Sequence, residues 1–198
     1  MNIPSFKEYL SEDKQTAYFT FGRMSPPNNG HSKILDALSD KASGSSYFVY
    51  LSPVHDKKKN PLQYDTKIKH ARKMFPKHAR SIKADKSVSN AFDAATHLYD
   101  EGYTKVIMVV GSDRVDEFEM RLNKHNGKKG PHGFYNFENG VKVVSAGSMD
   151  PESEGLSAQQ RSFCVDNDFT GFGQGLPSEM PNTDARQLFN DVRRGMGL

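Results

Sequence analysis

The sequence predicts a single α/β domain with a doubly wound parallel sheet and helices on both faces. Short apolar runs rich in β-branched and aromatic residues recur along the chain, and amphipathic stretches with helical periodicity separate them. Strands that alternate with helices favour a parallel sheet joined by right-handed crossovers. A length of 198 residues, with 35% hydrophobic and 26% charged residues, is also typical of one soluble domain with a full core.

The elements are predicted in alternating order. Strands are expected at 16–21, 47–51, 81–84, 105–110 and 141–145, and helices from about 30 to 43, at 64–75, from Ser89 to Gly102 and at 183–194. Lys105–Val110 is the most strand-like run and is expected in the middle of the sheet, buried on both faces. The glycine-rich, basic segment 123–133 is expected to be a flexible loop.

The loop Gly22–His31 leaves the first strand and enters the first helix. Gly22 and Gly30 lack a Cβ, so the backbone there can approach a ligand closely. A helix that opens near Asn29 or Gly30 would direct unpaired N–H groups at an anion, and Arg23 and His31 would add charge and donors. The same spacing is equally that of an ordinary turn followed by a histidine in a first helical turn.

The pattern Gly-Arg-x-x-Pro-x-x-x-Gly-His resembles the signature loop of the nucleotidylyltransferase superfamily, the group of cytidylyltransferases and nicotinamide-mononucleotide adenylyltransferases. That family has His-x-Gly-His or Thr-x-Gly-His here, so His31 matches its last histidine and Asn28 departs from its first position. The resemblance implies a Rossmann-like fold of that type and a catalytic role for His31 and Asn28 at the α-phosphate. It also implies nucleotide contacts from Gly22, Arg23, Met24 and Gly30.

Two further loops resemble parts of the same family. Asn60-Pro61-Leu62, which precedes a helix, is similar to the Asn-Pro-Phe segment of the adenylyltransferases, and it implies that at least one of Lys57, Lys58 and Lys59 meets a phosphate beside Asn60. A lysine run is otherwise usually a solvated loop. Gly111-Ser112-Asp113, after the strand at 105–110, resembles the loop that meets the base and ribose.

Gly155–Arg161 resembles the second signature of the family, Ile-Ser-x-Thr-x-x-Arg at a helix N-terminus. The resemblance implies that Ser157 and Arg161 hold the β- and γ-phosphates. The segment is one residue shorter than the family pattern, which turns the arginine by about 100° on a helix. Either the loop compensates or triphosphate binding is weakened. Asp168–Pro177 resembles the tail of phage-encoded members, so the resemblance covers Phe21 to Pro177.

Residues 1–13 form a separate amphipathic segment before a nucleotidylyltransferase-like domain at 14–198. Phe6, Tyr9 and Leu10 share one helical face, which is typical of a helix packed on the edge of a sheet. The segment also resembles the capsid-targeting peptides of large tailed phages, which are cut after sequences such as Leu10-Ser11-Glu12. That resemblance implies association with a phage capsid and packaging in the virion.

The expected function is transfer of an adenylyl or cytidylyl group from a nucleoside triphosphate to a small phosphorylated acceptor, with release of pyrophosphate. Mg²⁺ is expected to bridge the phosphates, with no dedicated metal ligands from the protein. Two alternatives stay open: a virion-associated protein that has lost activity, and a nucleotide-binding regulator.

The remaining expectations come from composition. A single cysteine, Cys164, favours a reducing compartment and thus the cytoplasm. A net charge of +3 is too small to indicate nucleic acid, no run is long and apolar enough for a membrane, and a homo-oligomer is left open.

Overall fold

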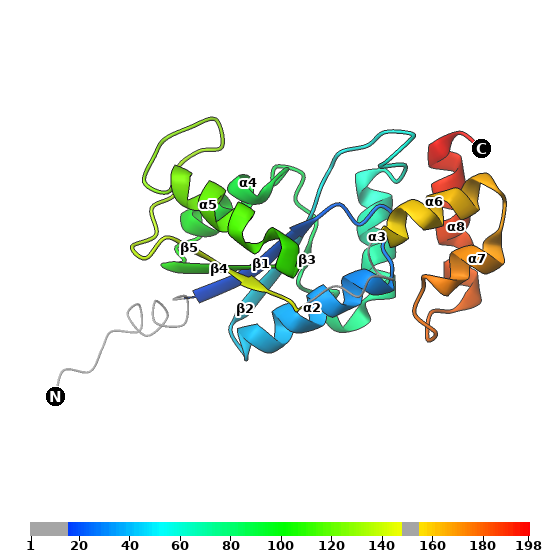
Figure 1. The fold of residues 1–198 in the computed structure, drawn as a ribbon, viewed down its shortest axis with the longest axis horizontal. Helices are drawn as coiled ribbons and strands as arrows, with labels where there is room; N and C mark the ends of the chain where they lie inside the picture. The colour runs from blue at the N-terminus through cyan, green and yellow to red at the C-terminus, as the bar shows by residue number, and fades with distance from the viewer. Residues whose placement is uncertain (1–15, 148–154) are drawn as a thin grey trace.

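The computed structural model describes residues 16–147 and 155–198 of the chain as an α/β fold (Figure 1). The expected N-terminal segment 1–13 lies outside the described residues. Five parallel strands form one sheet in the order β3-β2-β1-β4-β5. They are β1 (Thr16–Gly22), β2 (Ser46–Leu51), β3 (Ile82–Lys83), β4 (Lys105–Val110) and β5 (Val141–Ser145). All five predicted strands are confirmed, β3 being two residues long.

Helices cover both faces of this sheet. They are α2 (Asn29–Ala42), α3 (Tyr64–Met74), α4 (Ala91–Asp100), α5 (Val115–His125), α6 (Leu156–Val165), α7 (Phe169–Gln174) and α8 (Asn182–Met196), with 3₁₀ turns η1 (Pro76–His78) and η2 (Ser112–Arg114). Successive side chains of β2 enter opposite cores: Val49 packs with residues of α2, α3 and α8, and Tyr50 with residues of α4 and α5. The doubly wound architecture is therefore as the sequence predicts.

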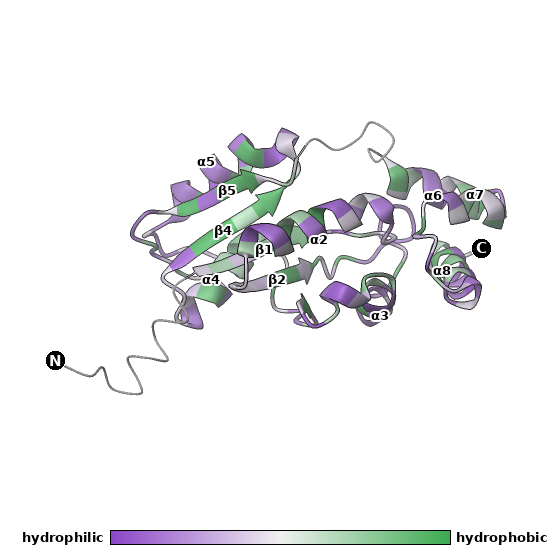
Figure 2. Ribbon diagram, turned by 90° about the horizontal axis from the view of Figure 1, so that it is seen from below, coloured by the Kyte–Doolittle hydropathy of each residue, from purple (hydrophilic) through white to green (hydrophobic). Residues whose placement is uncertain are grey.

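Strand β1 occupies the centre of the sheet, between β2 and β4. β4 is an interior strand, as predicted, and its side chains enter both cores; Figure 2 shows how hydrophobic β4 and β5 are. The chain runs from β1 to β2 on one side and later returns to add β4 on the other. This reversal places a topological switch point at the carboxyl ends of β1 and β4, where open α/β sheets bind ligands.

The segment after α5 differs from its prediction. The sequence predicts a flexible loop at 123–133, whereas helix α5 extends to His125 and the side chain of Asn126 bonds to both the N–H and the C=O of Phe137 at 2.9 Å. The Tyr135 hydroxyl donates to the Leu122 carbonyl at 2.7 Å, and His132 stacks on Phe92 and bonds to Asp93. These contacts hold the two ends of the loop, and its residues 127–131 are exposed.

The N-cap of α4 also differs by one residue from its prediction. Asn90 caps this helix, and its side chain accepts from the backbone N–H groups of Phe92 and Asp93. Ser89, with which the sequence predicts the helix to begin, instead donates to the Asp93 carboxylate at 2.6 Å. Asparagine and serine are comparably good N-caps, so the sequence alone does not separate them.

The C-terminal helices pack together at one end of the molecule (Figure 1). Helix α8 lies against α3, where Nε2 of the buried His70 meets the Asp191 carboxylate at 2.8 Å. Among the described residues, no helix combines the length and apolar character that a membrane span requires.

Candidate functional site

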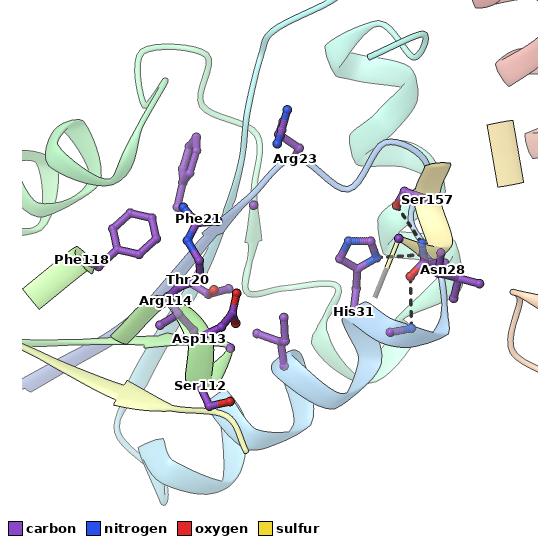
Figure 3. Close-up of a pocket in the computed structure, with 17 residues that line it drawn as sticks. Thr20, Phe21, Arg23, Asn28, His31, Ser112, Asp113, Arg114, Phe118 and Ser157 are labelled. Carbon is purple, nitrogen blue, oxygen red and sulfur yellow. Dashed lines mark hydrogen bonds between the residues drawn. The ribbon is translucent and has the colours of Figure 1, made fainter. Parts of the chain in front are cut away.

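A cleft of about 620 Å³ opens at the carboxyl ends of β1 and β4. It lies at this switch point, and Figure 3 draws the residues that line it as sticks. The end of β1, the first turn of α2, the segment from β4 into α5 and the start of α6 all contribute to its walls. The lining residues are Thr20, Phe21, Gly22, Arg23, Asn28, Gly30, His31, Ile34, Val110, Gly111, Ser112, Asp113, Arg114, Phe118, Gly155, Leu156 and Ser157.

Most of the predicted site residues are brought together in this cleft. Those that line it are Gly22, Arg23, Asn28, Gly30, His31, Gly111, Ser112, Asp113 and Ser157. Those that do not line it are Met24, Lys57, Lys58, Lys59, Asn60 and Arg161. The first signature loop, the Gly-Ser-Asp turn and the start of the second signature therefore converge, as expected for three loops at one edge of a parallel sheet.

Asn28 caps helix α2 so completely that its first turn has few free donors. The Asn28 side-chain oxygen accepts from Gly30 N at 3.1 Å, the Asn28 carbonyl accepts from His31 N at 3.0 Å, and Asn29 N donates to Gly175 O at 2.9 Å. The expectation of unpaired N–H groups at this terminus is therefore wrong. A good N-cap satisfies the same amides that an anion would need.

His31 faces the cleft in one defined tautomer. Its Nδ1 accepts from the backbone N–H of Asn28 at 3.1 Å, so in the neutral ring the proton sits on Nε2. Burial lowers the pKa of His31 from 6.5 to about 4. The ring is therefore a neutral hydrogen-bond donor at physiological pH, which suits a phosphate oxygen without adding a formal charge.

The start of α6 is open, in contrast to that of α2. Gly155 is the N-cap residue with φ of 75°, and its missing side chain leaves no cap. Within residues 16–147 and 155–198, no acceptor pairs with the N–H groups of Leu156 and Ser157, and both residues line the cleft. The positive end of the α6 dipole thus faces the same space as His31.

The polar side chains of the second signature face the first loop instead of the cleft. Ser157 Oγ donates to the Pro26 carbonyl at 3.0 Å and accepts from Asn28 Nδ2 at 2.8 Å. Arg161 donates to the Ser25 carbonyl at 2.5 Å, and its pKa is lowered by burial and by the nearby charge of Arg23. In this structure Ser157 contributes its amide to the cleft, and Arg161 contributes no atom.

The lysine run projects from a rigid turn outside the cleft. The Asp56 carboxylate accepts from Lys58 N at 2.9 Å, from Lys59 N at 2.7 Å and from Asn60 Nδ2 at 2.5 Å. These bonds lower the pKa of Asp56 to about 2, the bond from Lys59 N contributing most. Lys57 extends toward the end of α8, where its Nζ lies 3.9 Å from the position of a Cβ on Gly197.

Met24, predicted to contact nucleotide, belongs to the hydrophobic core. It is 3% exposed and packs in the core formed by α2, α3 and α8. Its backbone takes a φ of 42°, in the left-handed region, which turns the loop and directs the side chain inward. Met24 therefore shapes the loop that borders the cleft, and its side chain does not line the cleft.

Lys67 is a candidate that the sequence reading missed. It is fully buried on α3, and its Nζ donates to the Ser52 carbonyl at 2.8 Å. Burial is the main cause that lowers its pKa to about 8; the charge of Arg23 acts in the same direction and Asp56 opposes it. The sequence does contain a sign of this site: Lys67 falls on the apolar face of its helix, where Tyr64, Ile68 and Ala71 are buried beside it. Lys67 and Arg23 are thus two cations close enough to affect each other electrostatically.

Phe118 and Arg114 were also missed, and both line the cleft together with Asp113. The Arg114 guanidinium lies over the Phe118 ring, 5.0 Å from its centroid. Phe118 lies on helix α5, which the sequence reading did not include, and Arg114 directly follows the predicted Gly-Ser-Asp turn.

Comparison with models of known protein families finds no match to this chain, and comparison with curated proteins finds no significant match. Nor do three His, Cys, Asp or Glu side chains of residues 16–147 and 155–198 gather in a group that could hold a metal ion. Asp113 is the carboxylate among the cleft-lining residues.

Proposed function

We propose that this protein transfers a nucleotidyl group from a nucleoside triphosphate to a phosphorylated acceptor and releases pyrophosphate. The resemblance of the loops to those of nucleotidylyltransferases motivates the proposal. The observation that carries it is the placement of the His31 ring in the same cleft as the open N-terminus of α6 and the turn Gly111–Asp113. A nucleotide laid through the cleft would place its nucleoside at that turn and its phosphates at His31.

The chemistry follows from charge and position. An oxygen of the acceptor phosphate attacks the α-phosphorus in line, the bond from phosphorus to the bridging oxygen breaks, and pyrophosphate leaves. His31 Nε2 would donate to an α-phosphate oxygen, and the amides of Leu156 and Ser157 would receive the charge that develops on the leaving group. The protein's contribution is to hold the reacting atoms in line and to supply fixed donors.

The acceptor side is proposed at Arg23 and Lys67. Arg23 is exposed at the cleft, and Lys67 lies close enough for the charge of Arg23 to lower its pKa. Two neighbouring cations that disfavour each other favour an anion placed between them. A phosphate of the acceptor is the anion that the reaction requires at this position.

Mg²⁺ fits this cleft as an ion held chiefly by phosphate oxygens. Among the described residues, Asp113 would be the carboxylate nearest to it, since it lines the cleft. When bound, Mg²⁺ neutralises phosphate charge and favours departure of pyrophosphate.

The test is pyrophosphate release, measured with each of the four ribonucleoside triphosphates against a panel of phosphorylated acceptors. We expect one pair to give turnover, and the His31→Ala variant to lose about 10²- to 10³-fold in kcat. His125→Ala serves as the matched control, because His125 ends α5 at the opposite end of the sheet and bonds to the Arg121 carbonyl. Near-normal turnover in His31→Ala would contradict the proposal.

A second candidate is nucleotide binding without turnover, in a regulator or in a virion-associated protein. One observation favours it. The polar side chains of Asn28, Ser157 and Arg161 form hydrogen bonds to the protein backbone or to each other. Calorimetric binding of a nucleoside triphosphate, together with silence across the pyrophosphate panel, would support this candidate over the transferase. Capsid association has its own test: the protein taken from virions should begin at Asp13.

A further inference from the structure

We propose that Asn28 is a positioning residue of this cleft that acts through Ser157, and that it does not itself contact phosphate. The inference rests on the proposed function and concerns how the phosphate donors are held at a fixed spacing. Asn28 links the N-terminus of α2, which carries His31, to the N-terminus of α6, which carries the amides of Leu156 and Ser157. Figure 3 shows these contacts as dashed lines.

The burial of the Asn28 side chain and the number of its hydrogen-bond partners support this role. Asn28 is 2% exposed, and its side-chain oxygen accepts from Gly30 N at 3.1 Å. Its Nδ2 donates to Ser157 Oγ at 2.8 Å and makes a longer contact of 3.4 Å with the Pro26 carbonyl. An amide has two hydrogens on nitrogen, and both have partners here. A direct bond to phosphate would cost Asn28 one of these contacts.

The hydrogen bonds of Ser157 have fixed directions. Because its Oγ donates to Pro26 O and accepts from Asn28 Nδ2, the hydroxyl proton points into the signature loop. Arg161 adds a third bond across the same junction, to the Ser25 carbonyl. These cross-links join residues about 130 positions apart in the sequence, as the separation of 129 between Asn28 and Ser157 shows. They fix the position of the His31 ring relative to the amides at the start of α6.

An asparagine suits this junction because its two ends differ. The oxygen caps α2 while the nitrogen donates to α6, and a serine could perform the first task but would be too short for the second. The backbone N–H of residue 28, which sets the His31 tautomer, remains with either side chain. The Asn28→Ser substitution therefore removes the link to Ser157 while it keeps the cap.

The decisive experiment is a double-mutant cycle with Asn28→Ser, Ser157→Ala and the double variant, read out as kcat and KM for the triphosphate. If Asn28 acts through Ser157, each single variant loses about tenfold in kcat, and the double variant loses no more than either. If Asn28 touches phosphate directly, Asn28→Ser loses the same factor in both backgrounds. Such additivity would overturn the inference.

Asn90→Ser is the matched control, because Asn90 caps α4 through its side-chain oxygen in the same way and lies outside the cleft. It should leave kcat and KM unchanged. Its melting temperature gives the cost of exchanging an asparagine cap for a serine cap, against which Asn28→Ser is compared.

A readout without ligand separates this inference from the proposed function. Amide hydrogen exchange at 156–161 should accelerate in Asn28→Ser and in Ser157→Ala, and should stay unchanged in Asn90→Ser. Unchanged exchange in the first two variants would overturn the inference even if the enzyme is active. Absence of pyrophosphate release in the wild type would instead overturn the proposed function and leave the exchange result to decide this one.

Discussion

The backbone N–H of Asn28 donates to Nδ1 of His31 over 3.1 Å. Because a ring nitrogen that accepts carries no proton, this bond places the single proton of the neutral ring on Nε2, toward the cleft. The donor belongs to the main chain, so the tautomer does not depend on which side chain occupies position 28. The sequence pattern fixes the spacing of three residues, and the helix start supplies the geometry.

His31 should stay neutral far below the usual range of histidine. Burial lowers its pKa to about 4, so the ring should keep one proton, on Nε2, from pH 8 down to about 5. Nitrogen NMR of ¹⁵N-histidine-labelled protein, with the His31→Gln variant for assignment, measures both the tautomer and the titration. A midpoint near 6.5, or a proton on Nδ1, would contradict the assignment.

The same shift affects stability with a definite sign. Between pH 6.5 and about 4 the unfolded chain protonates this histidine while the folded chain does not, so the stability contributed by its neutral form is lost as pH falls through that window. His31→Gln should therefore show a weaker loss of unfolding free energy between pH 6.5 and 4.5 than the wild type. Equal slopes in denaturant titrations would contradict this.

Lys67→Met should weaken binding of the acceptor more than binding of the triphosphate. Methionine fills a similar volume and removes the buried charge near Arg23, so the KM for the acceptor should rise by about tenfold as the attraction for its phosphate weakens. Lys69→Met, an exposed position on the same helix, is the control and should leave KM unchanged. Pyrophosphate release measured over a range of acceptor concentrations gives both values. A rise confined to the KM for the triphosphate would contradict the assignment.

Lys67→Met should also flatten the alkaline stability profile. The folded pKa of about 8 lies below the value of 10.5 that an exposed lysine has, so the unfolded state binds more protons between these two values. Unfolding free energy of the wild type should therefore rise with pH from about 8 to 10, and the variant should lack this rise. Urea unfolding at pH 8, 9 and 10 checks it.

The strands could be predicted because their signal is local. Val106, Met108 and Val109 belong to an unbroken apolar run, and a run of that kind has few alternatives to a buried strand. Helix α5 could not be predicted in this way, since Leu122 is its one fully buried residue in the described structure and its remaining sequence is mostly polar. Its position depends on packing beside β5, which sequence periodicity does not contain.

The cleft could be predicted at the level of loops and less well at the level of atoms. Gly22, His31 and Asp113 were placed correctly because carboxyl ends of parallel strands meet at one edge. Arg161 was expected at the phosphates, yet it donates to the Ser25 carbonyl. Which partner a long side chain selects is decided by tertiary contacts, and the same holds for Lys67 and its bond to the Ser52 carbonyl.

Asp191→Ala should destabilise the packing of α8 on α3 by about 2 to 3 kcal/mol, because a hydrogen bond between the buried His70 and a carboxylate is lost. Asp184→Ala, which breaks the pair with Lys73 on the same helix interface, should cost less than about 1 kcal/mol, since both partners are partly exposed. Denaturant unfolding of both variants checks the difference. Equal losses would show that burial does not set the strength of the first pair.

Gly195→Ala should be the most damaging small substitution in the C-terminal region. A Cβ on Gly195 would lie 1.8 Å from the carbonyl oxygen of Pro61 and 2.6 Å from its carbon, and a backbone group cannot rotate away as a side chain can. Either α8 moves away from α3 or the turn at Pro61 shifts, and overpacking of this kind costs about 1 to 3 kcal/mol or more. Because Pro61 precedes the helix that carries Lys67, the acceptor KM should rise as well.

Gly173→Ala supplies the matched control for that prediction. Gly173 lies inside helix α7, and apart from its chain neighbours and the backbone of its own helix, no atom of the described structure comes within 4 Å of a Cβ placed there. This substitution should stabilise the protein by about 0.4 to 1 kcal/mol, because alanine reduces the freedom of the unfolded chain without a clash. Urea unfolding of the two variants should therefore shift in opposite directions from the wild type. A Gly195→Ala variant as stable as the wild type would show that α8 does not approach Pro61 this closely in solution.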